Sequence, residues 1–269
     1  MNRLHIIYED EQILVCQKDA GMPVQTASVR TADLTDLVRR HLSEKMELEA
    51  NNRREDKKLQ DRSSAAVPYL GVVHRLDQPV RGLVVFALNE KAAASLSAQA
   101  AGGMKKEYLA LVRTADIDYS GSVGSALILN HQEVLLEDYL IRDPKTNRSR
   151  VAGKGEKGSK QAALRCRIID DPQSEMYQAA VSIFAEEIEI LKEQKEQYAV
   201  LWIRLLTGRH HQIRVQLSHA GIPIIGDRKY GKEAGAGDYS GKTAYPALCA
   251  WRLELIHPKT KKEVVITLS

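Results

Sequence analysis

The chain has 269 residues, a net charge of +4 and 43% hydrophobic residues. This length suits one large domain or two small ones, and the weak positive charge is compatible with a polyanionic partner without requiring one. Cys16, Cys166 and Cys249 are far apart in the sequence. We therefore expect buried thiols in a reducing compartment, not disulfides or a zinc site. No apolar run approaches the ~18 residues of a membrane span, and acidic residues begin by Glu9, which excludes a signal peptide. We therefore expect a cytoplasmic protein that is not bound to a membrane.

Most of the predicted elements are strands. A strand is indicated by a short run of apolar residues, or of alternating apolar and polar residues, with polar residues on either side. Such runs are residues 4–8, 13–16, 69–73, 83–88, 105–113, 134–141, 161–169, 199–206, 248–256 and 264–268. The first two of these segments are close enough to form a hairpin. Many strands with a few helices between them predict an α+β fold with a mixed, mostly antiparallel sheet and flanking helices.

Three segments have the apolar periodicity of helices. We predict helices over residues 33–46, 89–101 and 208–220, with Thr31, Asn89 and Thr207 as their respective N-caps. Gly102-Gly103 and Gly221 follow the second and third of these segments, where glycine commonly ends a helix.

Three polar segments interrupt this pattern. Residues 49–66 have almost nothing to bury, so we expect an exposed insertion or loop, more simply solvated than bound to RNA. Residues 143–160 are loop-like, and their basic residues outnumber the acidic ones, which suits contact with phosphates. Residues 186–197 are rich in charge and predict a hairpin tip or a surface helix. We treat residues 1–269 as one catalytic domain that contains the 49–66 insertion.

Asp77 is the first candidate for chemistry. It follows His74 and Arg75 at a polar elbow between two predicted strands, and a Pro/Gly turn follows it. A carboxylate beside cations is expected to have a lowered pKa and to stay ionised, which suits a nucleophile or a base. Taken alone, this pattern favours a structural ion pair over a catalytic carboxylate.

Two further clusters carry charge. Arg209, His210, His211, Gln212 and Arg214 lie near a predicted helix N-terminus, which favours anions. Adjacent histidines point about 100° apart on a helix and are poor paired metal ligands. In the other cluster, a tyrosine follows two lysines, so it can stack on a base while the lysines hold phosphate. The residues of this cluster are Lys105, Lys106 and Tyr108. A half-buried strand tyrosine is the simpler alternative.

Four motifs follow one another along the chain. They are His74-Arg75-Leu76-Asp77 with Gly82-Leu83-Val84, then residues 106–112, then residues 207–217, then residues 221–227 with Tyr230-Gly231. Residues 7–10 and 21–24 match the same pattern at its start. Together and in this order, the motifs resemble those of the RluA-type pseudouridine synthases. The resemblance runs from about residue 4 to residue 268 and is interrupted at the polar insertions.

The resemblance implies a pseudouridine synthase fold with a central catalytic cleft. It implies isomerisation of uridine to pseudouridine in structured ribosomal or transfer RNA, with the base flipped into the cleft and no cofactor or metal. Asp77 would be the catalytic carboxylate, which either attacks covalently or removes a ribose proton. Tyr108 would stack on the uracil, and Arg214 would pair with Asp77 and keep it ionised.

The resemblance and the charge pattern together indicate which residues bind RNA or the target base. They are His74, Arg75, Lys105, Lys106, Arg209, His211, Gln212 and Leu217. His74 and Arg75 would lie at the RNA-facing rim, and Leu217 would pack beside the uracil. We expect a monomer with RNA as its partner.

Two departures from the family pattern affect the choice of substrate. Residues 78–81 replace a polar turn that ends in Thr-Ser, and Lys18-Asp19 replaces Lys-Pro. Many relatives carry a small RNA-binding domain before the core. Here the core begins near residue 4, so we expect that domain to be missing.

Two alternatives remain open. A catalytically inactive RNA-binding or ribosome-assembly factor could have the same fold, although an intact set of Asp77, Tyr108 and Arg214 argues against it. A nucleoside hydrolase would need a second acid, which the sequence does not offer.

Overall fold

The computed structural model describes residues 4–27, 32–56, 67–117, 123, 126–127, 132–231 and 245–268. The strands are β1 (His5–Glu9), β2 (Ile13–Lys18), β3 (Gly71–Val72), β4 (Arg81–Ala87), β5 (Lys105–Arg113), β6 (Val134–Asp143), β7 (Arg148–Ala152), β8 (Lys160–Ile169), β9 (Tyr198–Leu205), β10 (Leu248–Ile256) and β11 (Glu263–Thr267). The helices are α1 (Leu34–Asp56), α2 (Glu90–Ala100), α4 (Glu175–Ile183), α5 (Ala185–Glu193), α6 (Gln212–His219) and the short 3-10 helix η1 (Thr114–Asp116).

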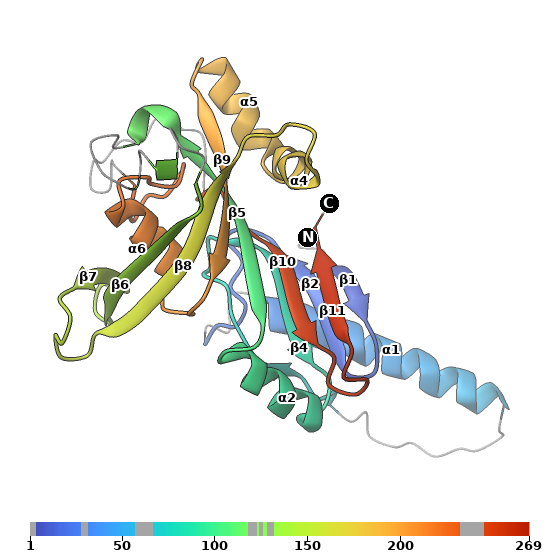
Figure 1. The fold of residues 1–269 in the computed structure, drawn as a ribbon. Coiled ribbons are helices and arrows are strands. Elements are labelled where there is room, and N and C mark those ends of the chain that lie inside the picture. The colour runs from blue at the N-terminus through green and yellow to red at the C-terminus, as the bar shows by residue number, and fades with distance from the viewer. Residues whose placement is uncertain are drawn as a thin grey trace.

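The described strands form one sheet. Their order is β1-β2-β4-β10-β5-β9-β8-β6-β7, with β11 beside β10 and β3 beside β4. Among these strands only β4 and β10 run parallel, and the other pairs are antiparallel. In Figure 1 the sheet is long and twisted, and β5 lies between the half that holds β6, β7 and β8 and the half that holds β1, β2, β4 and β10. The predicted mixed, mostly antiparallel α+β fold is therefore confirmed.

Helices cover the sheet on both faces. Side chains alternate along a strand, so Tyr108 and Ala110 of β5 lie in one core while Leu109 and Leu111 lie in the other. Helices α1 and α6 pack on the first core, and α2, α4 and α5 pack on the second. The face covered by α1 and α6 is the one that carries Tyr108 and, as described below, the candidate site.

The polar elbow lies between β3 and β4, as predicted, although β3 has only two residues. A hydrogen bond of 3.0 Å from the Val80 amide to the Asp77 carbonyl closes the turn. Gly82 follows with a φ of +126°, and a Cβ there would lie 2.4 Å from the Ala250 nitrogen. Only glycine tolerates both conditions, so Gly82 lets β4 start directly against β10.

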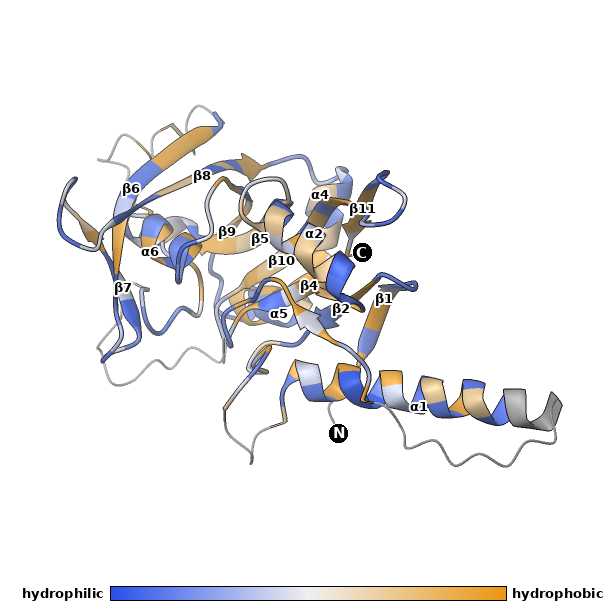
Figure 2. Ribbon diagram, turned by 90° about the horizontal axis from the view of Figure 1, so that it is seen from below, coloured by the Kyte–Doolittle hydropathy of each residue, from blue (hydrophilic) through white to orange (hydrophobic). Residues whose placement is uncertain are grey.

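The first helix is longer than the sequence suggested. Helix α1 reaches Asp56, so the first part of the predicted 49–66 loop is helical, and residues 57–66 lie outside the described residues. Both views show its outer part extending beyond the sheet, and Figure 2 shows hydrophilic and hydrophobic residues mixed along it. The predicted cap, Thr31, also lies outside the described residues. Asp33 caps the helix instead, because its Oδ1 accepts the Asp36 amide at 3.0 Å.

Other differences follow from tertiary contacts. Strand β7 lies within the predicted 143–160 loop and pairs with β6, so this basic segment is largely a hairpin. Helix α4 was not predicted, and α5 shows that the charged 186–197 segment is a surface helix over most of its length. Asn89 caps α2 as predicted. Thr207 does not cap α6, since His211 occupies the N-cap position and the Thr207 hydroxyl donates to Gln212.

The three cysteines are free and buried, and burial raises the pKa of each thiol to about 12. Such thiols pack as small apolar groups. In the described ranges, no helix is both long and apolar enough to cross a membrane.

Candidate active site

A cavity of about 870 Å³ lies on the face of the sheet that α1 and α6 cover. Its walls come from the elbow, β5, the segment that leads into α6, and the β6–β7 hairpin. The predicted site residues at these walls are His74, Arg75, Asp77, Lys106, Tyr108, Arg209, His211, Gln212 and Arg214. Segments far apart in the sequence therefore converge on one cavity, as expected of a ligand site.

Two predicted residues lie away from this cavity. Lys105 points to the other side of β5, where its ammonium forms an ion pair with Glu254 of β10. Leu217 is fully buried in the core beneath the site. The roles predicted for these two residues, RNA contact and packing against the uracil, are not supported by their positions.

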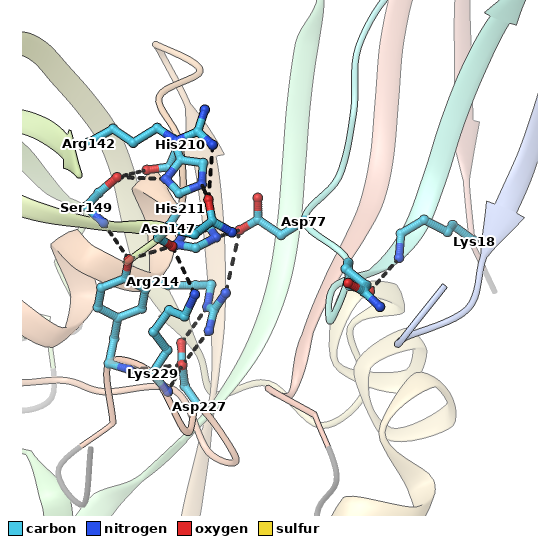
Figure 3. A network of polar contacts seen from close by, with 12 residues as sticks. Lys18, Asp77, Arg142, Asn147, Ser149, His210, His211, Arg214, Asp227 and Lys229 are labelled. Atoms are coloured by element: carbon cyan, nitrogen blue, oxygen red, sulfur yellow. Dashed lines mark hydrogen bonds and ion pairs between the residues drawn. The ribbon is translucent and has the colours of Figure 1, made fainter. Parts of the chain in front are cut away.

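The Asp77 carboxylate faces two nitrogen groups. Its Oδ2 lies 3.8 Å from Arg214 Nη1 and 3.8 Å from His211 Nε2. Figure 3 shows Asp77 facing these two side chains. The Asp77 side chain is 26% exposed. Burial raises its pKa above the ordinary aspartate value, although Arg214 opposes this shift. The prediction of a lowered pKa was therefore wrong, because loss of hydration outweighs the nearby cation.

Arg214 has a closer partner than Asp77. Its Nε and Nη2 donate to the two carboxylate oxygens of Asp227 at 2.7 and 2.6 Å, and the two side chains are only 5% and 1% exposed. Asp227 also accepts the backbone amides of Lys229 and Tyr230. This bidentate pair fixes the guanidinium and leaves Nη1 as the nitrogen that faces Asp77.

Tyr108 and Lys106 lie two residues apart on β5. Burial raises the pKa of the Tyr108 hydroxyl, so the phenol is neutral at physiological pH. Burial also lowers the pKa of the Lys106 ammonium, and both side chains line the cavity. An aromatic ring beside a cation at a cavity wall can stack on a base while the cation holds an anionic group.

His74 and Arg75 differ in their surroundings. His74 Nε2 accepts the Val85 amide at 3.0 Å, and burial lowers the pKa of the ring to about 3. Since an accepting nitrogen carries no proton, His74 is neutral and ties the elbow to β4. Arg75 is exposed at the rim of the cavity. The predicted rim position thus fits Arg75, whereas His74 uses its ring to brace the backbone.

Gln212 and Arg209 also have protein partners. Gln212 Oε1 accepts from the Thr207 hydroxyl and the Arg209 amide, and its Nε2 donates to the Ala163 carbonyl at 3.0 Å. Gln212 therefore stabilises the entry to α6. Arg209 Nε donates to the Gln161 carbonyl, but the side chain is exposed, and within the described ranges its Nη1 and Nη2 have no hydrogen-bond partner.

The β6–β7 hairpin is joined to this wall by several polar contacts. The Ser149 amide donates to the Tyr230 hydroxyl at 2.7 Å, and Lys229 Nζ donates to the Asn147 carbonyl at 2.9 Å. His210 contacts the side chains of both Ser149 and Asn147. Figure 3 shows Asn147, Ser149, His210 and Lys229 gathered on one side of Asp77.

Several residues of the site were not among the predicted ones. Asp227 and Tyr230 stand in a motif that the sequence showed, but nothing there indicated their contacts with Arg214 and His211. Lys18 is fully buried behind the elbow, and its Nζ donates to the carbonyls of Asp19, Met22 and Gln78. The sequence feature that could have predicted this role is the position of Lys18 at the end of an apolar strand.

Comparison with known proteins finds a matching family and similar chains. Residues 12–219 match the family described as RNA pseudouridylate synthase. The chain is 31% identical over 229 residues to the ribosomal large subunit pseudouridine synthase D of Xylella fastidiosa, a match that covers 85% of this chain and 52% of the relative. It is 26% identical over 272 residues to the tRNA pseudouridine synthase C of Vibrio vulnificus, covering 98% of this chain and 89% of that relative.

A solved structure shares the fold. The human RNA pseudouridylate synthase domain containing 1 superposes with a TM-score of 0.60 at 20% identity, covering 99% of this chain and 83% of that one. The chain spans 52% and 60% of the length of the Xylella fastidiosa and Xanthomonas campestris relatives named synthase D.

Proposed function

This chain belongs to the RNA pseudouridylate synthase family, and from that premise we propose that it isomerises uridine to pseudouridine in structured RNA. The observation that carries the proposal is the position of Asp77. Its carboxylate lies at the wall of a cavity of about 870 Å³, beside Arg214 and His211. A cavity of this size is within the range that holds small ligands or a flipped nucleotide.

The chemistry exchanges one bond of the nucleotide for another. The bond from ribose C1′ to uracil N1 breaks, the base turns while still bound, and a bond from C1′ to C5 forms. N1 gains a proton, and C5 loses one. Asp77 either attacks C1′ or removes a ribose proton, and each role requires the ionised carboxylate. Because burial raises the pKa of Asp77, activity should fall on acidification at a higher pH than it would for an ordinary aspartate.

Two neighbours support this role for Asp77. Arg214, fixed by Asp227, keeps a positive charge beside the carboxylate. Tyr108 lines the same cavity with a neutral ring, which suits stacking on the uracil and a position near the proton that leaves C5.

The substrate is ribosomal or transfer RNA, as the names of the relatives suggest. Arg75, Arg142 and Arg209 line the cavity, and Lys145, Arg148 and Arg150 stand on or beside the β6–β7 hairpin. These cations suit the phosphates of a folded RNA. Binding should therefore weaken steeply with salt. Replacing Arg142 or Arg209 by Gln should each reduce by about one the slope of the log of the RNA-binding constant against the log of the salt concentration. Fluorescence anisotropy of labelled RNA measures this slope, and binding that does not depend on salt would count against the proposal.

The test of the function is to map pseudouridine in total RNA from cells with and without this gene. The proposal expects at least one site in ribosomal or transfer RNA to disappear on deletion. The wild-type gene should restore the site, and so should the control variant Asp171→Asn, which changes an exposed aspartate that does not line the cavity. The Asp77→Ala variant should not restore it. No change at any site would favour the inactive RNA-binding alternative.

We also propose that the chain works as one catalytic unit and as a monomer in the cytoplasm. The continuous sheet, covered on both faces by helices, supports the first part. Sedimentation of the active protein at micromolar concentration tests the second, since a dimer would contradict it.

A further inference from the structure

The hydroxyl of Tyr230 has two neighbours at hydrogen-bond distance. The Ser149 amide donates to it at 2.7 Å, and His211 Nδ1 lies 2.7 Å from it. A phenol has one hydrogen to donate. Among the described residues, His211 Nδ1 is the one available acceptor for that hydrogen. Tyr230 therefore donates to Nδ1, and the hydrogen of the neutral imidazole must be on Nε2.

The surroundings of His211 keep its ring neutral. The ring is buried and stacks on His210 at 3.7 Å between ring centroids. Burial lowers its pKa to about 2, and the positive charges that add to this effect are on Arg214, Lys229 and Arg142. Both imidazole nitrogens are thus assigned: Nδ1 accepts from Tyr230, and Nε2–H points at Asp77 Oδ2, 3.8 Å away.

The backbone of His211 is in an uncommon conformation that serves this direction. Its φ is +54° and its ψ is 26°, the left-handed region, and its side chain does not cap α6. This conformation is unfavourable for residues other than glycine unless the surroundings enforce it. The His211 side chain makes no capping hydrogen bond to the first turn of α6, and its ring lines the cavity instead.

Two donors therefore aim at the same oxygen of Asp77. Arg214 Nη1 and His211 Nε2 both face Oδ2. Among the described residues, neither oxygen of this carboxylate has a hydrogen bond, but both nitrogens that lie within 4 Å of it face Oδ2 and none faces Oδ1. The positive and polar groups thus approach the carboxylate from the Oδ2 side.

We propose that His211 is a positioning residue whose neutral Nε2–H, set by Tyr230, holds Oδ2 of Asp77 together with Arg214, so that Oδ1 is the reacting oxygen. This inference rests on the proposed function of Asp77 and deepens it. It replaces the RNA contact predicted for His211 by a contact with the catalytic carboxylate. The 3.8 Å separation is expected to shorten when substrate fills the cavity.

The first experiment reads the tautomer without reference to activity. Nitrogen NMR of the folded protein, with histidine labelled and His211 assigned from the His211→Asn spectrum, should show a protonated Nε2 and a hydrogen-bonded, unprotonated Nδ1 at pH 7. The Tyr230→Phe variant should lack the change in the Nδ1 chemical shift that the hydrogen bond from the Tyr230 hydroxyl causes. A protonated Nδ1 in the wild type would overturn the inference, whether or not the protein proves to be a pseudouridine synthase.

The second experiment separates positioning from folding. His211→Gln keeps an N–H near the place of Nε2, whereas His211→Asn has a shorter side chain and suits the left-handed backbone. We expect His211→Asn to lower kcat by about 10- to 100-fold with little change in KM, and to move the acidic limb of the rate profile to higher pH, since a lost donor to a carboxylate has this order of effect. His211→Gln should recover most of this loss.

The pH profile reflects Asp77, and the groups that act on its charge come from several elements. They are Arg214 of α6, Asp227 and Lys229 after it, and Lys18 of β2. His219→Asn is the matched control, because this histidine ends the helix that His211 precedes, is exposed, and pairs with Asp138. Folding of each variant is checked by its melting temperature. Wild-type kcat and an unshifted acidic limb in a folded His211→Asn protein would overturn the proposal. If Asp77→Asn also kept full activity, the proposed function itself would fail, which is a separate outcome.

Discussion

Lys18→Met should destabilise the protein and disturb the turn that carries Asp77. The Lys18 ammonium is fully buried and donates to the Asp19, Met22 and Gln78 carbonyls at 2.9, 2.7 and 2.9 Å. Burial lowers its pKa to about 8, so it is still protonated at pH 7. The Gln78 carbonyl is in the turn that begins at Asp77 and also accepts the Gly21 amide. Lys18 thus joins the end of β2 to the elbow.

The size of the effect follows from these contacts. Methionine keeps the length and apolar volume of the stem but leaves three carbonyls without their donor. A buried carbonyl without a partner costs about 1–3 kcal/mol. Water can reach Asp19 and Gln78, which lie near the surface, whereas the Met22 contact is buried. The ammonium no longer has to be desolvated, which offsets part of the loss. We expect a decrease of ~2–4 kcal/mol in the free energy of unfolding.

Urea denaturation and turnover together test this prediction. Lys192→Met, an exposed lysine paired with Glu189, serves as the control and should change stability by less than ~0.5 kcal/mol. Lys18→Met should also lose activity under conditions in which it is fully folded, because the turn is no longer fixed. If Lys18→Met were as stable and as active as the control, the reasoning about the buried ammonium would be refuted.

Three further predictions follow from the structure. Arg81 of β4 forms a largely buried ion pair with Glu187 of α5, so Arg81→Ser and Glu187→Gln should each cost ~1–3 kcal/mol and the double variant less than their sum; additive values in a double-mutant cycle would exclude coupling. His74 has a folded-state pKa of about 3, so between pH 6.5 and 3 the unfolded state binds a proton that the folded state does not. Stability should fall by ~2 kcal/mol on acidification to pH 5, and His74→Gln should reduce this loss in urea titrations; an unchanged slope would contradict the assignment. Gly82→Ala places a Cβ 2.4 Å from the Ala250 nitrogen at a φ of +126°, so it should cost ~4 kcal/mol or more; a melting temperature within about 2 °C of the wild type would refute the predicted clash.

The sheet was predictable because its strands carry local signals. The apolar runs of β5, β9 and β10 indicated strands whose bounds lie within a residue or two of those observed. The polar elbow was marked by Pro79 and Gly82 between two apolar segments. Strand β7 was missed because its polar sequence becomes a strand only through pairing with β6.

The residues at the site were easier to predict than their contacts. Asp77, Tyr108 and Arg214 converge on one cavity, but the strongest partner of Arg214 is Asp227, which lies 13 positions further along the chain. The raised pKa of Asp77 depends on burial, which no local sequence reveals. Burial, and pairing between segments that are separate in the sequence, thus determined the points at which the sequence reasoning failed.

The most direct test of Asp77 uses purified protein and RNA labelled with tritium at uracil C5. Formation of the C1′–C5 bond releases this tritium to water. We predict that the wild-type protein releases tritium from unmodified ribosomal or transfer RNA with formation of pseudouridine, and that Asp77→Asn, with an unchanged melting temperature, releases none. Release by Asp77→Asn at the wild-type rate, or none by the wild type from either RNA class, would contradict the account.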